Sequence, residues 1–395
     1  MDILKNQIFN GLYAKMNKKY TDRAVAVIGD PNDINCWSNI PYFFLQAGQK
    51  SGFFQTGLPL QPERQQWTRL GWNLASIFRG ERYGGFQYTR KANESWFKQL
   101  DLTDISEIIC HFQLFPPYEL ANKFNISFSH YIDFPLPCLF QDYGIVNTIG
   151  KKTADYALKR EQEQYQAARY VVCMSPWTAS QVIERCGIHP EKVKVIIPGA
   201  NLPESAFDST TKTPLTDPPD GKNIPLRIAF VGKIPLRKGL DRLVEGVRIL
   251  RARGYKTQVR VIGPKENLFP DDPEVEHLGF INKLHEPLRL VEELQSCHIG
   301  ALPSYQEAFG IAALEYLRCG LPALITKVGG LGDSIPDDCG LILASDCTGE
   351  DIADSLENLL KNPDLFQRLR ENAQKNASYA SWDRTIRQFE ELWRK

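Results

Sequence analysis

The chain has 395 residues, and at about 150 residues per domain this length predicts two or three domains. Hydrophobic residues make up 43% and charged residues 24%, a composition that excludes a disordered, collagen-like or low-complexity chain. Because 47 Lys and Arg balance 47 Asp and Glu, no overall field would draw the protein onto nucleic acid, and we expect no nucleic-acid partner.

The first residues, 1–6, lack the apolar core of a signal peptide, and no stretch approaches the roughly 20 apolar residues of a spanning helix. The nine cysteines include no C-x-x-C pair, and most lie inside apolar runs. This favours buried, reduced thiols over the alternatives of a disulfide framework or a zinc site. We therefore expect a cytoplasmic protein without a metal site, and leave open a peripheral contact with a membrane.

In the first half of the chain, short β-branched apolar runs alternate with longer segments, a pattern typical of βαβ units and parallel sheets. These runs predict strands at 24–28, 108–111, 126–130, 170–174 and 193–197. Between 204 and 225 the composition shifts to Ser, Thr, Pro, Asp and Gly, which predicts a linker. The N-terminal domain should therefore occupy residues 1–205.

The second half is more regular, with helices predicted to begin near 240, 288 and 310. Its strands are predicted at 227–231, 258–262, 299–302, 323–326 and 341–343. On the first of these helices, one face is apolar and the opposite face should meet water through Asp241, Arg242, Glu245, Arg248 and Arg251. We predict a C-terminal domain over 206–378. A last helix within 379–395 carries Trp382, Ile386, Phe389 and Trp393 at helical spacing.

Ligands of α/β sheets bind at the carboxyl ends of the strands, so the loops there are the first to inspect. After the strand at 227–231 come Gly232 and three cations that precede a helix: Lys233, Arg237 and Lys238. Clustered cations beside free helix amides would suit a phosphate. The ordinary alternative is a solvated surface turn.

The loop after the strand at 299–302 carries two carboxylates, Glu307 before the next helix and Glu315 inside it. Carboxylates accept hydrogen bonds from hydroxyls, which suits a sugar or a ribose, although two ordinary surface glutamates remain an alternative. Gly310 would let a ligand approach the backbone as the helix begins. The amides predicted to be free for an anion belong to Phe309, Gly310 and Ile311.

Taken together, these loops resemble the donor domain of the GT-B glycosyltransferases, specifically family 4. The marks of that family are present as Gly232-Lys233, Lys238-Gly239, Pro303-Ser304 and the E-x7-E motif from Glu307 to Glu315. The resemblance covers about residues 165–395. It implies an α/β protein of the GT-B fold, with two Rossmann-like domains whose parallel sheets face each other across a crevice. It also implies that the helix in 379–395 crosses back to the N-terminal domain.

The resemblance further implies a retaining glycosyltransferase that uses a nucleotide-sugar donor and no metal cofactor. The donor would bind the C-terminal domain, and a glycan, lipid or small-molecule acceptor the N-terminal one. The expected catalytic residues are Glu307, Lys238 and His130, with His111 as a competing histidine. The residues expected to bind the donor are Gly232, Lys233, Arg237, Lys238, Ser304, Phe309, Gly310, Ile311 and Glu315. Of the two glutamates, Glu307 would face the donor sugar and Glu315 the ribose.

Three alternatives belong to other functional classes. A nicotinamide-dependent oxidoreductase would need Gly-x-Gly-x-x-Gly after a strand, and no strand here is followed by it. A non-catalytic binding or scaffold protein stays open, because Ser38-Asn39 stands where the family has paired glycines after its first strand. A nucleotide-sugar epimerase on the same fold also stays open.

Overall fold

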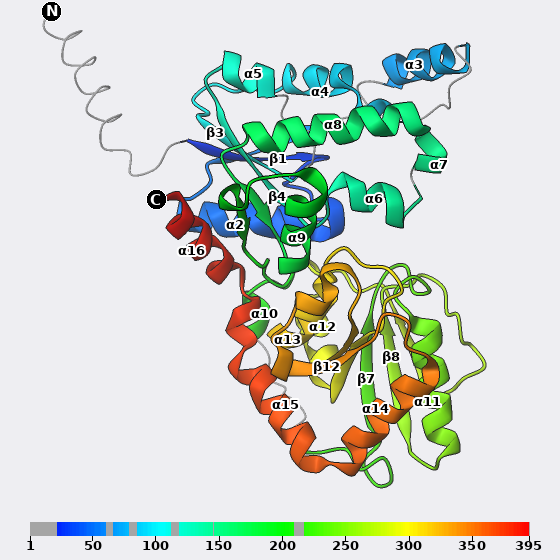
Figure 1. Cartoon of the computed structure of the whole chain (residues 1–395). Coiled ribbons are helices and arrows are strands. Elements are labelled where there is room, and N and C mark those ends of the chain that lie inside the picture. The colour runs from blue at the N-terminus through cyan, green and yellow to red at the C-terminus, as the bar shows by residue number, and fades with distance from the viewer. Residues whose placement is uncertain are drawn as a thin grey trace, which may run out of the picture. The chain divides into compact units, whose positions relative to one another are not determined.

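The computed structural model contains two β-sheets with helices packed on them (Figure 1). It describes residues 22–60, 66–78, 85–111, 118–144, 146–208 and 217–394. The central part of the predicted linker, 209–216, and the N-terminal stretch 1–6 lie outside the described residues.

The first sheet has six strands in the order β2-β1-β3-β4-β5-β6. Their bounds are β1 Arg23–Ile28, β2 Thr56–Leu60, β3 Glu107–Cys110, β4 Ser127–Ile132, β5 Val171–Cys173 and β6 Val193–Val195. β1 pairs in parallel with β2 and β3, and β3 pairs in parallel with β4. The five predicted strands are confirmed. The sequence did not predict β2, because Gly57 and Pro59 weaken its strand pattern; the sheet tolerates this proline because β2 is an edge strand.

The register of the first sheet is fixed by charge as well as by apolar packing. Arg23 and Glu107 are paired across β1 and β3, and their side chains form a buried ion pair of 2.7 Å. The Arg23 guanidinium also lies over the ring of Phe53 at 4.0 Å. The helices of this half are α2 Ile40–Ser51, α3 Gln66–Phe78, α4 Arg90–Phe97, α5 Tyr118–Lys123, α6 Leu136–Asp142, α7 Val146–Ile149, α8 Lys151–Ala167 and α9 Pro176–Cys186.

The second sheet also has six strands, in the order β12-β11-β10-β7-β8-β9, and every pairing in it is parallel. Their bounds are β7 Leu226–Val231, β8 Thr257–Ile262, β9 Val275–Gly279, β10 Ile299–Leu302, β11 Ala323–Thr326 and β12 Gly340–Leu343. The five predicted strands are again confirmed. The sequence did not predict β9, an edge strand whose residues are mostly half-buried and which therefore lacks a continuous apolar run.

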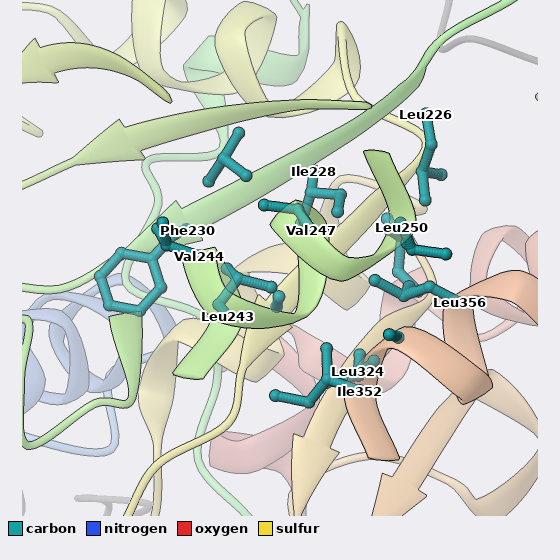
Figure 2. Close-up of a cluster of buried hydrophobic side chains, with 14 of the residues drawn as sticks. Leu226, Ile228, Phe230, Leu243, Val244, Val247, Leu250, Leu324, Ile352 and Leu356 are labelled. Atoms are coloured by element: carbon teal, nitrogen blue, oxygen red, sulfur yellow. The ribbon is translucent and has the colours of Figure 1, made fainter. Parts of the chain in front are cut away.

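The core of the second sheet lies under helices α11 and α14, as Figure 2 shows. Leu243 and Val247 of α11 pack with Ile352 of α14 and with the strand residues beneath them. The two helices approach closely at Gly246, where an added Cβ would lie 2.8 Å from the Ile352 side chain. The helices of this half are α10 Ser205–Asp208, α11 Leu240–Ala252, α12 Pro287–Gln295, α13 Ile311–Arg318, α14 Gly349–Lys361, α15 Pro363–Lys375 and α16 Trp382–Trp393. The predicted helix starts near 240, 288 and 310 are confirmed.

The chain divides into two compact units, each built from several segments. One unit contains residues 1–132, 143–172 and 186–192, and the other contains 133–142, 173–185 and 193–395. The C-terminal helix α16 belongs to the second unit and packs there on the segment 197–200. The Thr385 hydroxyl donates to the Ile197 carbonyl at 2.9 Å, and the Ala200 amide donates to the Ala380 carbonyl at 2.8 Å. The predicted domain boundaries and the crossing of this helix to the N-terminal domain stay predictions.

All nine cysteines are buried and free, in agreement with the expectation of reduced thiols. Among the helices that the structure describes, none is both long and apolar enough to span a bilayer.

Candidate functional site

Three loops meet at the carboxyl ends of the neighbouring strands β7, β10 and β11. A Cβ added to Gly239, in the loop after β7, would lie only 1.8 Å from the Pro303 carbonyl oxygen after β10. A Cβ added to Gly329, after β11, would lie 2.0 Å from the carbonyl oxygen of Glu307. Both glycines also have positive φ, so these positions require glycine for two reasons, and the three loops form one continuous backbone cluster.

Within this cluster the structure joins four of the predicted site residues. The Lys238 ammonium lies 2.9 Å from Oε2 of Glu307, and the Arg237 guanidinium lies 3.4 Å from Oε1. The Ser304 hydroxyl is 3.4 Å from the same carboxylate. Gly232 leaves room for the Lys238 stem, because a Cβ there would lie 2.3 Å from Lys238 Cδ. Two cations and one carboxylate leave the cluster with a net positive charge, which favours an anionic ligand.

Lys233 does not join this group. Its ammonium lies over the ring of Phe280, 5.0 Å from the centroid. The three cations predicted as one cluster therefore do not lie together. The loop places Arg237 and Lys238 against Glu307, whereas Lys233 points toward an exposed aromatic ring.

The start of α13 supplies the predicted backbone donors. Gly310 is the N-cap residue with φ of 81°, and the helix begins at Ile311. Among the described residues, the amides of Phe309, Gly310 and Ile311 donate no hydrogen bond. Free amides at a helix start carry partial positive charge and suit an anion.

Glu315, on the first turns of α13, is completely buried. The Lys283 ammonium donates to its Oε1, while its Oε2 has no hydrogen-bond partner among the described residues. A buried carboxylate oxygen without a donor typically costs about 1–3 kcal/mol, so this site is suited to a ligand that supplies a donor. The sequence did not predict Lys283, which lies in the irregular segment after the unpredicted strand β9 and carries no motif.

Helix α13 is held in place by the residue next to Glu315. The Tyr316 hydroxyl accepts a hydrogen bond from the Val231 amide at 2.8 Å and donates one to the Ala301 carbonyl at 3.1 Å. Burial raises the pKa of Tyr316, so the hydroxyl keeps the proton that it donates. Tyr316 thus connects α13 to β7 and β10, and the position of Glu315 follows from this connection.

Arg242 does not face water, and the prediction from helix periodicity is wrong at this position. The side chain is buried, and its guanidinium donates to the carbonyls of Pro303, at 2.6 Å, and Ser304, at 2.5 Å. It also donates to the Cys347 carbonyl at 3.0 Å. The reason is that the loop after β10 approaches the first turn of α11 closely. The carbonyls of this loop need a donor, and Arg242 supplies it. Arg242 therefore supports the loop that carries Glu307.

Asp133 is a further residue that the sequence analysis did not single out. It follows β4 directly, and its carbonyl accepts a hydrogen bond of 2.7 Å from the Thr178 hydroxyl. Burial raises the pKa of Asp133 to about 6, and the charge of Glu307 adds to the shift. The signal that could have identified it is its position at the carboxyl end of a predicted strand.

Comparison with known proteins assigns this part of the chain to a family. Residues 218–376, which contain all three loops and α13, match the family model "Glycosyl transferases group 1". This segment is a group 1 glycosyl transferase domain. The D-inositol 3-phosphate glycosyltransferase of Gordonia bronchialis is 29% identical over 244 residues, which are 57% of this chain and 52% of that protein. The same enzyme of Corynebacterium aurimucosum is 30% identical over 253 residues, 59% of this chain and 58% of that protein. The match thus spans little more than half the length of these relatives.

Solved structures extend the similarity of the fold beyond the group 1 domain. Sucrose-phosphate synthase of Thermosynechococcus elongatus superposes with a TM-score of 0.61 at 16% identity, covering 94% of this chain and 98% of that one. HepE of Anabaena in complex with UDP and glucose also has a TM-score of 0.61, at 13% identity, covering 94% and 99%. Together with the two parallel sheets, these similarities confirm the predicted GT-B fold.

Outside the group 1 domain, neither candidate histidine is exposed, although His111 is only half-buried. His130 is fully buried on β4, with ring contacts to Phe128 at 5.9 Å and Tyr165 at 5.1 Å. His111 contacts the rings of Phe44 and Tyr131, each at 5.1 Å, and burial lowers its pKa to about 3. His111 is therefore neutral at physiological pH. The catalytic role of His130 stays a prediction.

The loop after β1 adopts a backbone conformation that usually belongs to glycine. Ser38 has φ of 59° and Asn39 has φ of 72°, and the preceding Trp37 has φ of 38°. Left-handed backbone costs a non-glycine residue about 1–2 kcal/mol. Ser38 and Asn39 therefore adopt a backbone conformation accessible to the paired glycines that the family has at this place, but each carries a side chain there.

Proposed function

We propose that this chain transfers a sugar from a nucleoside diphosphate sugar to an acceptor hydroxyl and retains the anomeric configuration. The observation that supports this best is the arrangement around the E-x7-E motif of the group 1 domain. Glu307 meets two cations, and the buried Glu315 has one oxygen without a donor. One end of the motif thus suits the diphosphate and sugar, and the other suits a hydroxyl-bearing ribose.

The cations and amides would act on the diphosphate. Cleavage of the bond between sugar and phosphate places negative charge on the departing diphosphate, and donors that are already in position stabilise this charge. Lys238 and Arg237 supply the cations, and the amides of residues 309–311 supply neutral donors. These groups would take the role of a divalent ion, and we propose that no metal cofactor is needed.

The two glutamates would act on hydroxyl groups. Glu307 accepts hydrogen bonds from the donor sugar, and its negative charge stabilises the positive charge that develops on the ring. The free Oε2 of Glu315 accepts a hydrogen bond from the ribose. The leaving phosphate takes the proton of the acceptor hydroxyl on the same face of the sugar, so that no protein nucleophile is required and the configuration is retained.

The comparisons indicate which ligands to test first. HepE is described as a complex with UDP-glucose in one of its structures, so UDP-glucose is the first donor. The relatives named above act on D-inositol 3-phosphate, so a phosphorylated polyol is the first acceptor, ahead of glycans and lipids.

Donor binding is tested by thermal shift with UDP-, GDP- and ADP-sugars, since a ligand that binds the folded state raises its apparent stability. We expect one nucleotide series to raise Tm, and Glu315→Gln to reduce that shift. Glu276→Gln, in a pair of 2.9 Å with Arg260, is the matched control and should leave the shift unchanged. If none of the three series raises Tm, the donor proposal is wrong.

Retention is tested by NMR of the purified product, which should have the anomeric configuration of the donor. Inversion would contradict the proposal, and so would activity that EDTA abolishes and manganese restores.

A second candidate is a binding protein without turnover, which the side chains at Ser38 and Asn39 favour. Hydrolysis of the donor in the absence of acceptor separates the two, because a protein that only binds would shift Tm without releasing nucleoside diphosphate.

A further inference from the structure

Lys283 reaches Glu315 from another part of the second unit. It lies in the segment between β9 and α12, whereas Glu315 lies on α13, and the Lys283 ammonium donates to Oε1 of Glu315. The Lys283 side chain is 16% exposed and that of Glu315 is 1% exposed, so bulk water screens the pair little. This pairing satisfies one oxygen of the buried carboxylate and leaves the other to be explained.

A turn before α12 fixes the position of Lys283. The side-chain oxygen of Asn282 accepts hydrogen bonds from the amides of Leu284, at 2.9 Å, and His285, at 3.2 Å. These two bonds enclose Lys283, so its backbone is held and its side chain starts from a defined point. The lysine therefore meets Glu315 as part of a fixed arrangement of donor and acceptor groups.

The pair presents a free acceptor and free donors side by side. Oε2 of Glu315 is buried and has no hydrogen-bond partner in the described part of the chain. An ammonium has three hydrogens to donate, and among the described residues Glu315 is the one acceptor that Lys283 contacts. Because both groups adjoin the same carboxylate, the spacing of the free acceptor and the free donors is comparable to that of the two oxygens in a vicinal diol.

A diol suits this pair better than an ion does. A hydroxyl group can both donate and accept, so two neighbouring hydroxyls can satisfy Oε2 of Glu315 and the ammonium of Lys283 together. An anion would be repelled by the carboxylate, and a cation by the ammonium. The opposite charges of the two side chains cancel, which favours a neutral polar ligand.

The pair also lies at the right place for the ribose of a nucleotide. Glu315 is four residues after Ile311, which is about 6 Å along α13 from the helix start. The amides proposed to bind the diphosphate are at that helix start. A sugar ring attached to this diphosphate would therefore reach the pair.

We propose that Lys283 donates a hydrogen bond to one hydroxyl of the nucleotide ribose while Glu315 accepts one from the neighbouring hydroxyl. This inference rests on the proposed function, and it adds Lys283 as a residue that determines specificity for a ribonucleoside diphosphate with both hydroxyls. A nucleotide without one of them would leave either a buried oxygen or a shielded ammonium without its partner. Sites that bind a hydroxyl in this way reject the analogue that lacks it.

The test is calorimetric titration of the full-length protein with UDP, GDP and ADP, and then with the 2′-deoxy and 3′-deoxy forms of the tightest of the three. The wild type should bind each deoxy form at least about tenfold more weakly than the ribonucleotide. Lys283→Met should bind one deoxy form as tightly as the ribonucleotide, because the hydroxyl that Lys283 contacts no longer contributes, and should still discriminate against the other. Lys283→Arg, which keeps a charged donor, should restore most of the lost discrimination.

Lys361→Met is the matched control, because it also removes a lysine from a pair with a glutamate, at 2.6 Å from Glu357 in the same domain. It should discriminate like the wild type. Circular dichroism and Tm report whether each variant is folded. If Lys283→Met does not fold, Lys283→Gln carries the same comparison with a polar side chain that is uncharged and shorter.

Two results would overturn this inference alone: a wild type that binds the ribonucleotide and both deoxy forms equally, or a Lys283 variant that weakens all three by the same factor. The second result would mean that the lysine only holds Glu315 in place. If the wild type binds none of the three ribonucleotides, the proposed donor is wrong and this inference is wrong with it.

Discussion

The ammonium of Lys238 and the carboxylate of Glu307 form an ion pair of 2.9 Å between the loops after β7 and β10. Their side chains are only 13% and 10% exposed, so the pair is mostly shielded from solvent. The resemblance implies that Lys238 faces the negative charge of the phosphate and that Glu307 faces the positive charge that develops on the sugar. In the structure, each of these two charges is held in place by the other.

Lys238→Ala and Glu307→Gln should each lower the rate of transfer by at least about 100-fold, the usual effect of removing one charge-stabilising contact. Each should also lower the free energy of unfolding by about 1–3 kcal/mol, because the remaining partner stays shielded. Steady-state kinetics and urea unfolding measure the two effects. Glu276→Gln is the control for the loss of an ion pair in the same domain. If Lys238→Ala or Glu307→Gln transfers sugar at the wild-type rate, the substituted residue has no part in the mechanism.

Tyr316→Phe removes one oxygen and leaves the Val231 amide and the Ala301 carbonyl without their partner. We expect the free energy of unfolding to fall by about 1–3 kcal/mol. Because α13 carries Glu315, donor affinity measured by calorimetry should fall as well. Tyr255→Phe, which removes a half-buried hydroxyl bonded to Glu357, is the control and should not change donor affinity. Unchanged stability of Tyr316→Phe would show that these hydrogen bonds do not hold the helix.

Asp133 should make stability depend on pH. Its pKa is raised from 3.8 to about 6 by burial first, so the folded state binds the proton more tightly than the unfolded state. Stability contributed by this proton is fully present below pH 3.8 and is lost as pH rises through about 6. Asp133→Asn should therefore be more stable than the wild type at pH 8, by up to about 3 kcal/mol, and nearly equal to it below pH 4. Urea unfolding at both pH values measures this difference, and Asp271→Asn, at an exposed position, is the control. If Asp133→Asn raised the free energy of unfolding by the same amount at pH 4, the prediction would be wrong.

Ser38→Gly should raise the free energy of unfolding by about 0.5–1 kcal/mol. Glycine removes the penalty of φ at 59°, and this gain exceeds the loss from a more flexible unfolded chain. Ser38→Ala removes the same hydroxyl and keeps the Cβ, so it should show no gain. Equal thermal unfolding of the glycine and alanine variants would mean that the left-handed backbone is not strained in this protein.

Gly199→Ala tests the packing of the C-terminal helix α16. An added Cβ would lie 2.4 Å from the Trp382 backbone nitrogen, which cannot move away as a flexible side chain could. We expect a loss of stability of at least about 2 kcal/mol, in the range of other overpacked sites. The control is Gly71→Ala, because an added Cβ at Gly71 would have open space around it. Gly254 also has open space, but its positive φ would strain an alanine. A Tm of Gly199→Ala equal to that of the control would show that α16 packs loosely.

Sequence alone was sufficient for the interior of both sheets. Buried parallel strands carry apolar side chains on both faces, so they appear as short apolar runs between helices. The glycines, cations and glutamates of the loops were also recognisable, because the motif positions lie close together along the chain. The edge strands β2 and β9 were not predicted, since an edge tolerates proline, glycine and polar residues that a central strand does not.

Only the tertiary structure decided which charges meet. Lys283 and Glu315 are 32 residues apart, and nothing in either segment indicates that the lysine will lie against a buried carboxylate. Helix periodicity places Arg242 on the polar face of α11, but the approach of a loop from another strand buries it. Helix α3 shows the reverse case, because its apolar residues recur with the periodicity of a core helix, yet packing through Ser76 and Trp72 leaves its apolar side exposed. In each case the deciding factor is the neighbour that folding brings to a residue, and local sequence carries no information about that neighbour.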